Sequence, residues 1–309
     1  MKLVVLTTKT SLRPLFEAAK ELSAELGLDM SLEVFYTHQL DEGEEALQRR
    51  LHEALRDSDV VLLDIRTPTS RFVKELPTAL SSSRAKVVLP LVAGSPRLLG
   101  LLRLGGFTGS FMSSRVKELE MDVEHLDMSK AWRMMELAKK ARSALPLGPL
   151  KHLGNWAKCV DYWALHGKRN LKNLILLLLR DYFGYRVEVE EPRLEVAPGL
   201  VWDPFHGSCR QLEDYVAELD LSRPTVAIFM YSGMHFDQCR PVAEGLSREL
   251  KGLGVNAVPI VGGGSKDLLR NVDILRRNTQ LHGKPFVDAV VNLQWFRIVG
   301  GPYGGPAEP

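Results

Sequence analysis

The sequence predicts an α/β protein built from two doubly wound parallel-sheet units, of the Rossmann or flavodoxin-like kind, joined by a helical segment. Short apolar runs of strand length alternate with amphipathic helical patterns, first in the N-terminal 112 residues and again after residue 223. The chain of 309 residues, 45% apolar and 25% charged, has the composition of a globular protein and the length of about two domains. We expect an N-terminal α/β domain at 1–112, a helical connector at 113–198 and a second α/β domain at 199–309.

The first unit is predicted from four apolar runs that alternate with helical patterns. The run at 59–65 is apolar enough to lie inside a parallel sheet, where both faces of a strand are covered. A glycine, Gly27, should end the first helix, and an acidic first turn suits the second helix, at 41–56. The third helix, at 70–80, should be interrupted at Pro77. The four strands are expected at 2–8, 31–37, 59–65 and 86–92.

The connector is predicted to be mainly helical. A long helical region is expected at 113–143, followed by two short helices in 151–184 that are separated at His166-Gly167. The second short helix is apolar on all sides from Leu171 to Leu179, so it should be buried, and we place the pair at the seam between the two α/β units. Alternating residues in 185–196 predict an edge strand after it.

The second unit is predicted as a β-α-β-α-β arrangement, which gives a second parallel sheet with right-handed connections. The chain then ends on the glycine- and proline-rich run 300–309. We expect the natural chain to continue beyond Pro309, with this sheet truncated before its remaining elements. The strands are expected at 225–231, 256–261 and 288–293, and the helices at 239–253 and 265–277.

The charge balance and the cysteines argue against several classes of protein. The formal charge is +2, from 40 basic and 38 acidic residues, without the basic excess of a general nucleic-acid binder. The three cysteines lie far apart, without metal-ligand spacing, and give no disulfide framework, so a cytoplasmic location is expected. The apolar run Leu174–Leu179 is far too short to span a bilayer.

Several motifs in the chain follow a known order. The first is Tyr162…Gly167…Asn170…Asn173-Leu174, ahead of a buried helix, and the others are Arg223–Tyr231, Gly254–Ile260, Val287–Leu293 and the glycine loop Gly300–Gly305. In their order and spacing they resemble the large subunit of cobaltochelatase (the CobN family) and the related H subunit of magnesium chelatase. The chain departs from the family pattern at His166, where the family has Gly, and in 199–204, where the family's His is not kept.

The resemblance implies part of the tetrapyrrole-binding large subunit of an ATP-dependent class I chelatase. It implies Co²⁺ as the substrate metal, inserted into hydrogenobyrinic acid a,c-diamide in cobalamin biosynthesis, and AAA+ partner subunits that hydrolyse ATP. The alternative within the family is magnesium insertion into protoporphyrin IX. We expect the catalytic residues outside this chain, which would be inactive alone. An alternative from a different class is a non-catalytic two-domain α/β module that binds a small ligand.

Candidate site residues lie at the carboxyl ends of the predicted strands, where open parallel sheets bind ligands. We predict substrate contacts from Tyr231, His235, Asn292 and Gly301. We also predict a metal role for His235, with Asp237 as a second ligand or as the carboxylate that orients the imidazole. The family's histidine in this loop has no gapless counterpart here, because His235 lies two residues further on.

Four further features have two interpretations each. The run Gly262–Lys266 could bind an anion through its N–H groups or form a plain strand-to-helix turn. The run Thr7–Ser11 could bind a phosphate or cap a helix. His206 could serve a site or lie at the surface. The aromatic residues Trp156, Tyr162 and Trp163 could stack on a macrocycle, whereas an aromatic stripe on a helix is usually core.

Overall fold

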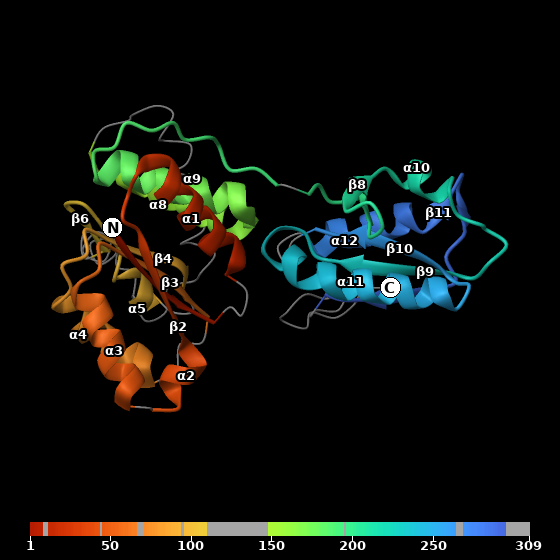
Figure 1. Cartoon of the computed structure of the whole chain (residues 1–309). Coiled ribbons are helices and arrows are strands. Elements are labelled where there is room, and N and C mark those ends of the chain that lie inside the picture. Colours follow the sequence, from red (N-terminus) through yellow and green to blue (C-terminus); the bar gives the residue numbers. More distant parts are fainter. Residues whose placement is uncertain are drawn as a thin grey trace, which may run out of the picture. The chain divides into compact units, whose positions relative to one another are not determined.

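The computed structural model describes residues 1–8, 12–43, 45–66, 71–93, 96–109, 148–194, 196–263 and 268–294. The helical region predicted at 113–143 and the loop at 300–309 lie outside these ranges. Contacts divide the chain into two compact units, Met1–Ala164 with Lys168–Pro192, and Leu165–Gly167 with Arg193–Pro309 (Figure 1). Within the described ranges, no helix combines the length and the apolar character that crossing a bilayer requires.

The first unit is built on a sheet with four parallel strands, as the sequence predicts. The strands β1 (Lys2–Thr7), β2 (Ser31–Tyr36), β3 (Val60–Ile65) and β4 (Val87–Ala93) lie in the order β2-β1-β3-β4. The short antiparallel strands β5 (Arg103–Leu104) and β6 (Phe107–Thr108) continue the sheet beyond β4. Because the chain leaves β1 for β2 on one side and returns to β3 on the other, the sheet is doubly wound.

Helices cover both faces of this sheet. Helix α1 (Arg13–Leu26) ends at Gly27, whose φ of 62° is the left-handed conformation expected of a C-cap. The helix predicted at 41–56 begins at Glu45, after a shorter helix that ends at Asp41, and Gly43 between them also has a positive φ. The opposite face from α1 carries α2 (Thr37–Asp41), α3 (Glu45–Arg56), α4 (Arg71–Ser81) and α5 (Pro96–Leu99) (Figure 1).

The predicted interruption at Pro77 is wrong, because α4 continues through this residue to Ser81. A proline inside a helix lacks one N–H donor and crowds the carbonyl four residues earlier. The helix persists because its apolar face is buried on both sides of the proline, with Leu76 at 0% and Leu80 at 3% exposure. Packing of that face against the sheet outweighs the lost hydrogen bond.

The two helices of the connector pack within the first unit. Helix α8 (Pro149–Leu165) donates from Trp156 Nε1 to the Pro90 carbonyl at 2.8 Å and from Trp163 Nε1 to Asp64 Oδ2 at 3.0 Å. Helix α9 (Gly167–Tyr182) buries the apolar residues of Leu171–Leu179 as predicted, except Leu176, which is half-buried. Figure 1 shows α8 and α9 beside α1, on the same face of the sheet. The aromatic residues of α8 are therefore core residues.

The break between these helices lies at the predicted position. His166 has a φ of 56° and Gly167 a φ of 79°, so both residues adopt the left-handed conformation. The family's glycine at the position of His166 would adopt this conformation without steric cost, whereas histidine is one of the less disfavoured alternatives. His166 thus adopts a backbone conformation that a glycine reaches without steric cost. Gly184, with a φ of 78°, follows the end of α9 as predicted.

The edge strand predicted in 185–196 is absent from the described residues, which run over α8 and α9 without pairing to a sheet. Side chains of the two helices hold this segment instead. Asn173 Oδ1 accepts from the Glu190 N–H at 2.8 Å, and the Tyr162 hydroxyl donates to the Glu190 carbonyl. Lys158 Nζ lies 2.5 Å from Glu191 Oε1. The motif residues Tyr162 and Asn173 therefore tie the segment leaving α9 to the helix pair.

Replacing Asn173 by Ala should release this segment. The Glu190 amide loses its acceptor, so its hydrogen exchange should accelerate by roughly tenfold, which corresponds to the net strength of one hydrogen bond. Exchange monitored by mass spectrometry or NMR over 185–194 measures the effect. Arg186→Ala, an exposed residue of the same segment, is the matched control and should change nothing. Unchanged exchange at Glu190 in Asn173→Ala would contradict this role.

The second unit contains the predicted parallel arrangement and an additional hairpin. Strands β9 (Thr225–Met230), β10 (Asn256–Val261) and β13 (Ala289–Asn292) are parallel, in the order β13-β9-β10. Helix α11 (Phe236–Gly252) connects the first pair, and α12 (Leu268–Asn278) lies between β10 and β13 in sequence. The hairpin of β7 (Val201–Asp203) and β8 (Ser208–Arg210) pairs antiparallel to β10, where the sequence suggests only a turn.

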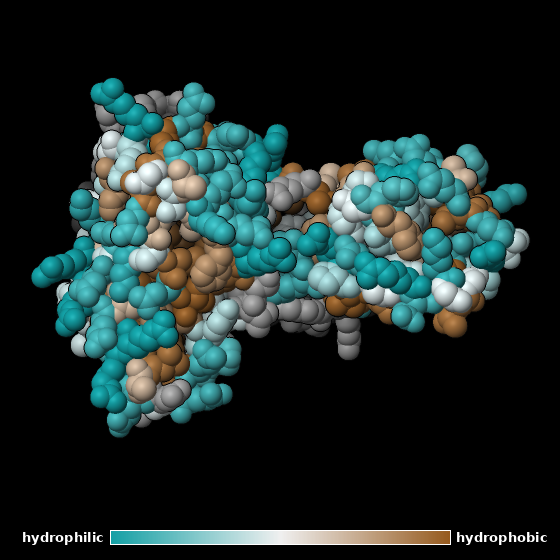
Figure 2. Space-filling model, in the orientation of Figure 1, coloured by the Kyte–Doolittle hydropathy of each residue, from teal (hydrophilic) through white to brown (hydrophobic). Residues whose placement is uncertain are grey.

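The remaining elements of this unit are short. They are α10 (Leu212–Val216), the 3-10 helix η2 (Gly233–His235) and the two-stranded sheet of β11 (Gln280–Leu281) and β12 (Lys284–Pro285). Figure 2 shows that polar and charged side chains cover most of the visible surface of both units, with apolar side chains exposed in patches.

Candidate functional site

The carboxyl edge of the second sheet contains a topological switch point. From β9 the chain passes through α11 to β10 on one side, and β13 lies on the other side of β9. Connections that leave a strand in opposite directions open a crevice beyond its carboxyl end, which is the usual ligand position in such sheets. Two segments border it, Met230–Ser232 after β9 and Asn292–Gln294 after β13.

Carboxamide side chains tie these strand ends together. Gln294 Nε2 donates to the Met230 carbonyl at 3.1 Å, and its Oε1 accepts from Asn271 Nδ2 at 3.3 Å. Asn271 Oδ1 in turn accepts from the Gly263 N–H at 2.5 Å. Asn271 and Gln294 are 0% and 6% exposed. This buried chain of amides fixes the ends of β9, β10 and β13 relative to one another.

Tyr231, His235 and Asn292 are brought to this same edge, as the sequence predicts from their positions after the strands. The Tyr231 and His235 rings lie 5.1 Å apart between centroids, and His235 Nδ1 lies 3.1 Å from Gln238 Oε1. Tyr231 and His235 are buried, at 1% and 8% exposure, while Asn292 is exposed and accepts from the Gln294 N–H at 3.0 Å. Contact of these residues with substrate stays a prediction, and Gly301 lies outside the described residues.

The metal role predicted for His235 and Asp237 also stays a prediction. Gln238 Oε1 lies at hydrogen-bond distance from Nδ1 of the His235 ring. Across the described ranges, no three His, Cys, Asp or Glu side chains are grouped so that they could bind one metal ion. Ligands additional to these two residues would have to come from elsewhere.

The other candidates are placed as follows. Gly262 and Gly263 are buried at the end of β10, and 264–266 lie outside the described residues, as do 9–11 of the run Thr7–Ser11. Thr7 is buried in β1. None of the three cysteines forms a disulfide bond, and burial raises the pKa of the Cys209 thiol to about 11.

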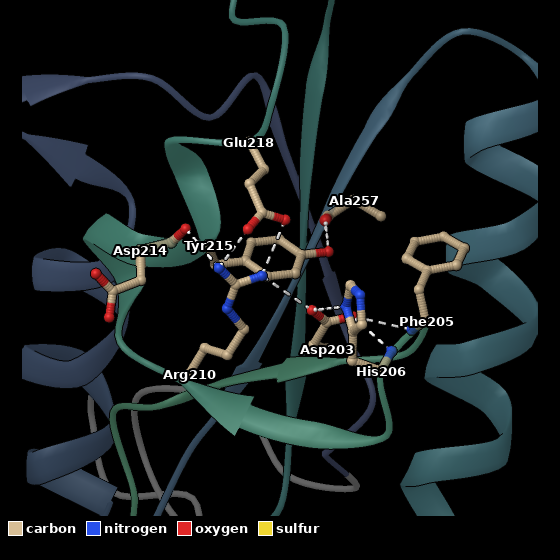
Figure 3. Close-up of polar contacts among 8 residues, drawn as sticks. All are labelled: Asp203, Phe205, His206, Arg210, Asp214, Tyr215, Glu218 and Ala257. Carbon is tan, nitrogen blue, oxygen red and sulfur yellow. Dashed lines mark hydrogen bonds and ion pairs between the residues drawn. The ribbon is translucent and has the colours of Figure 1, made fainter.

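A second polar cluster lies on the β7–β8 hairpin (Figure 3). The Asp203 carboxylate, 2% exposed, accepts from the backbone N–H groups of Phe205 and His206 at 2.9 and 3.0 Å and from His206 Nδ1 at 2.8 Å. Arg210 lies 3.2 Å from Asp203 Oδ2 and forms a two-pronged ion pair with Glu218, at 2.6 and 3.0 Å. Sequence patterns missed this cluster, although Asp-Pro followed by Gly207 is a turn signal between two short strands.

Hydrogen bonds determine the ionisation of Asp203. Burial acts to raise the pKa of its carboxyl, but the hydrogen bonds from His206, from the Phe205 amide and from Arg210 outweigh burial and hold this pKa below its ordinary value. The His206 side chain is 68% exposed, which confirms the surface interpretation. It borders a pocket of about 320 Å³ together with Glu218, Arg223, Lys251 and Asn256. Cations and anions both line this pocket, and each charge on the hairpin has a partner, so the cluster stabilises the hairpin.

Asp203→Asn should lower the free energy of unfolding of the second unit by about 2 kcal/mol at neutral pH, the strength of hydrogen bonds to a charged group. Because the pKa of Asp203 is lower in the folded state, its contribution is present above the unfolded pKa of about 3.9 and disappears as the pH falls through the folded value. Urea unfolding between pH 7 and 3 measures this. Asp220→Asn, an exposed carboxylate, is the control and should cost below about 0.5 kcal/mol. If the loss in free energy of unfolding for Asp203→Asn did not become smaller at low pH, the stabilising role of the ionised Asp203 carboxylate would be contradicted.

The chain is similar in sequence and in structure to known proteins. Residues 160–308 match the CobN/Magnesium Chelatase family. Over 267 residues the chain is 24% identical to the H subunit of magnesium chelatase from Chlorobaculum parvum (strain DSM 263 / NCIMB 8327), an alignment that covers 81% of this chain and 20% of that protein. The chain therefore spans about a fifth of the length of this curated relative. The catalytic subunit of cobaltochelatase from Mycobacterium tuberculosis aligns with 94% of this chain and 18% of that chain, with 13% identity and a TM-score of 0.44.

Proposed function

We propose that the chain is a tetrapyrrole-binding part of a class I chelatase large subunit, because residues 160–308 match the CobN/Magnesium Chelatase family. The observation that carries the proposal is the extent of that match, which includes α9, the second sheet and its switch point. Tyr231, His235 and Asn292 lie inside the matched stretch, at the edge where open sheets bind ligands.

The chemistry of metal insertion determines what a chelatase large subunit must provide. Metal insertion requires that the ion lose its water, that the macrocycle distort and that a base accept the two pyrrole protons. We propose that AAA+ partner subunits hydrolyse the ATP that drives this cycle, and that the present chain contributes to binding. His235 is the base or metal ligand that we assign to this edge, because it follows β9 at the switch point, and Asp237 lies two residues further along the chain.

Access to His235 requires a local movement. His235 and Tyr231 are buried, so a macrocycle would reach the imidazole only if the single-turn helix η2 moves away from the strand end. Asn292 is exposed and can contact a ligand without rearrangement. We therefore propose Asn292 as a first contact and His235 as a second, with Gly301 as a further contact.

Two substrate pairs are proposed. The first is Co²⁺ with hydrogenobyrinic acid a,c-diamide, which follows from the motifs shared with cobaltochelatase. The second is Mg²⁺ with protoporphyrin IX, which is favoured by the similarity to the H subunit of a magnesium chelatase across 81% of this chain. The two pairs differ in the metal ion, in the side chains of the macrocycle and in the macrocycle itself, because a corrin ring is contracted and more saturated than a porphyrin ring.

Titration of the chain with each macrocycle, followed by quenching of tryptophan fluorescence, tests the proposal. Saturable quenching by the corrin precursor alone supports cobalt insertion, and preference for protoporphyrin IX supports magnesium insertion. Asn292→Ala should weaken binding roughly tenfold if this residue contacts the macrocycle, whereas Val242→Ala, an exposed position on α11, is the control. Absence of quenching by either macrocycle would overturn tetrapyrrole binding by this chain.

A further inference from the structure

Two buried donors beside the switch point have no acceptor in the described part of the chain. Trp202, on β7, is 7% exposed, and its Nε1–H forms no hydrogen bond. The Nε–H of Arg240, on the second turn of α11, is also buried and unsatisfied. Most buried donors in proteins are paired, and a donor left without a partner costs stability. Two such donors on neighbouring side chains need an explanation.

The two side chains are neighbours across an apolar cluster. The Arg240 guanidinium carbon lies 5.9 Å from the centroid of the Trp202 ring, and Phe236 packs edge-on against the same ring at 5.4 Å. These aromatic residues belong to a cluster with Ile228 and Met230 of β9 and with Tyr231, which follows that strand at the switch point. The unsatisfied donors therefore lie in a largely apolar environment, where electrostatic interactions are strong.

Arg240 also lacks a carboxylate partner. Within the described ranges it forms no ion pair, whereas Arg248, two turns further along α11, lies 3.8 Å from Glu244. The chain thus places a half-buried guanidinium over the Trp202 ring without an ion-pair partner within the described ranges. Arg240 is also close to the N-terminal end of α11, whose partial positive charge adds to the attraction for an anion.

We propose that Trp202 Nε1 and Arg240 form a binding site for the carboxylate group of a ligand. A carboxylate offers two acceptor oxygens, which can pair with a guanidinium and an indole N–H at once, and an ionised acceptor gives the stronger hydrogen bonds. Both macrocycles of the proposed function bear carboxylate side chains, so the assignment of a tetrapyrrole carboxylate rests on that function. The partial exposure of Arg240 provides the side from which the group enters.

A small carboxylate tests the site without any macrocycle. Acetate and succinate are titrated against the full chain at constant ionic strength, with chloride as the reference salt, while tryptophan fluorescence is recorded. A saturable change is expected that disappears in Trp202→Phe, which keeps the aromatic packing but removes the donor. Arg240→Gln should weaken the response roughly tenfold or more, and Arg248→Gln, a paired and exposed arginine of the same helix, should leave it unchanged.

Thermal unfolding separates this role from a structural one. If Arg240 serves only to cover Trp202, Arg240→Gln should lower the melting temperature in carboxylate-free buffer. If it forms an anion site, Arg240→Gln should leave that temperature unchanged or raise it, and only the wild type should gain stability on addition of succinate. A lowered melting temperature together with a fluorescence response that does not depend on Arg240 would overturn the site.

The macrocycle then identifies the source of the carboxylate. Protoporphyrin IX should bind more tightly than its dimethyl ester, and Arg240→Gln should abolish that preference. If acid and ester bind equally while succinate still gives the Trp202 response, the site stands and serves a small carboxylate. If neither macrocycle binds but succinate does, the proposed function fails and the carboxylate site remains. No Trp202-dependent response to any carboxylate would overturn the inference.

Discussion

Gly262→Ala is expected to lower the free energy of unfolding of the second unit by about 3 kcal/mol, the range of overpacking in a closed site. Gly262 follows β10 at the switch point. A Cβ atom there would lie 2.5 Å from Gln294 Nε2, 2.7 Å from the Phe229 ring and 2.8 Å from the Met230 carbonyl oxygen. Two of these atoms belong to the hydrogen bond that joins Gln294 to Met230, so the methyl group cannot enter without displacing that bond.

Chemical denaturation with residue-resolved hydrogen exchange over 225–263 measures this cost. The matched control is Gly245→Ala on α11, where a Cβ atom would meet nothing within 4 Å and the helix should gain about 0.5–1 kcal/mol. Because the two variants make the same chemical change, opposite signs would isolate the packing at the switch point. If Gly262→Ala lowered the free energy of unfolding by less than an ordinary surface substitution does, the strand ends would be able to shift apart.

The central parallel strands were predictable because each is a short apolar run that is buried on both faces, which leaves little choice of structure, whereas β13 was predictable from its apolar run although it is exposed. Val60–Ile65 and Asn256–Val261 are buried at every position. The same reasoning brought Tyr231, His235 and Asn292 to one edge, since parallel strands end on the same side of a sheet. For residues that directly follow parallel strands of one sheet, this position in the sequence is thus enough to predict that they lie close to one another.

The polar networks were not predictable in this way. Asn271 lies on a helix, and no periodic pattern in the sequence marks it. It belongs to the switch point because it donates a hydrogen bond to Gln294, a residue 23 positions further along the chain. Asp203 lies at the end of a strand of three residues, which is too short for alternation to identify. The run 185–194 has strand-like alternation, yet side chains of α8 and α9 bind its backbone instead. In each case specific side-chain hydrogen bonds decide the local structure, and for Asn271 and the run 185–194 the partners are distant in sequence.

Trp163→Ala is expected to be the most destabilising single change in the first unit, at about 4 kcal/mol. The side chain is 0% exposed, so its removal leaves a large cavity between α8 and the sheet. It also removes the Nε1 donor from the Asp64 carboxylate, which is itself 0% exposed and retains Arg66 at 3.5 Å. A buried carboxylate that loses a donor costs more than a neutral group would.

The Phe variants separate the two contributions. Trp163→Phe fills most of the cavity but lacks the donor to a charged acceptor, and should cost about 2 kcal/mol, whereas Trp156→Phe loses a donor to the neutral Pro90 carbonyl and should cost about 1 kcal/mol. Asp64→Asn should cost less in the Trp163→Phe background than in the wild type, because it removes the charge that was left without its donor. Equal costs for the two Phe variants, measured by urea unfolding, would mean that Arg66 alone compensates Asp64. The indole would then act through its volume and not through its hydrogen bond.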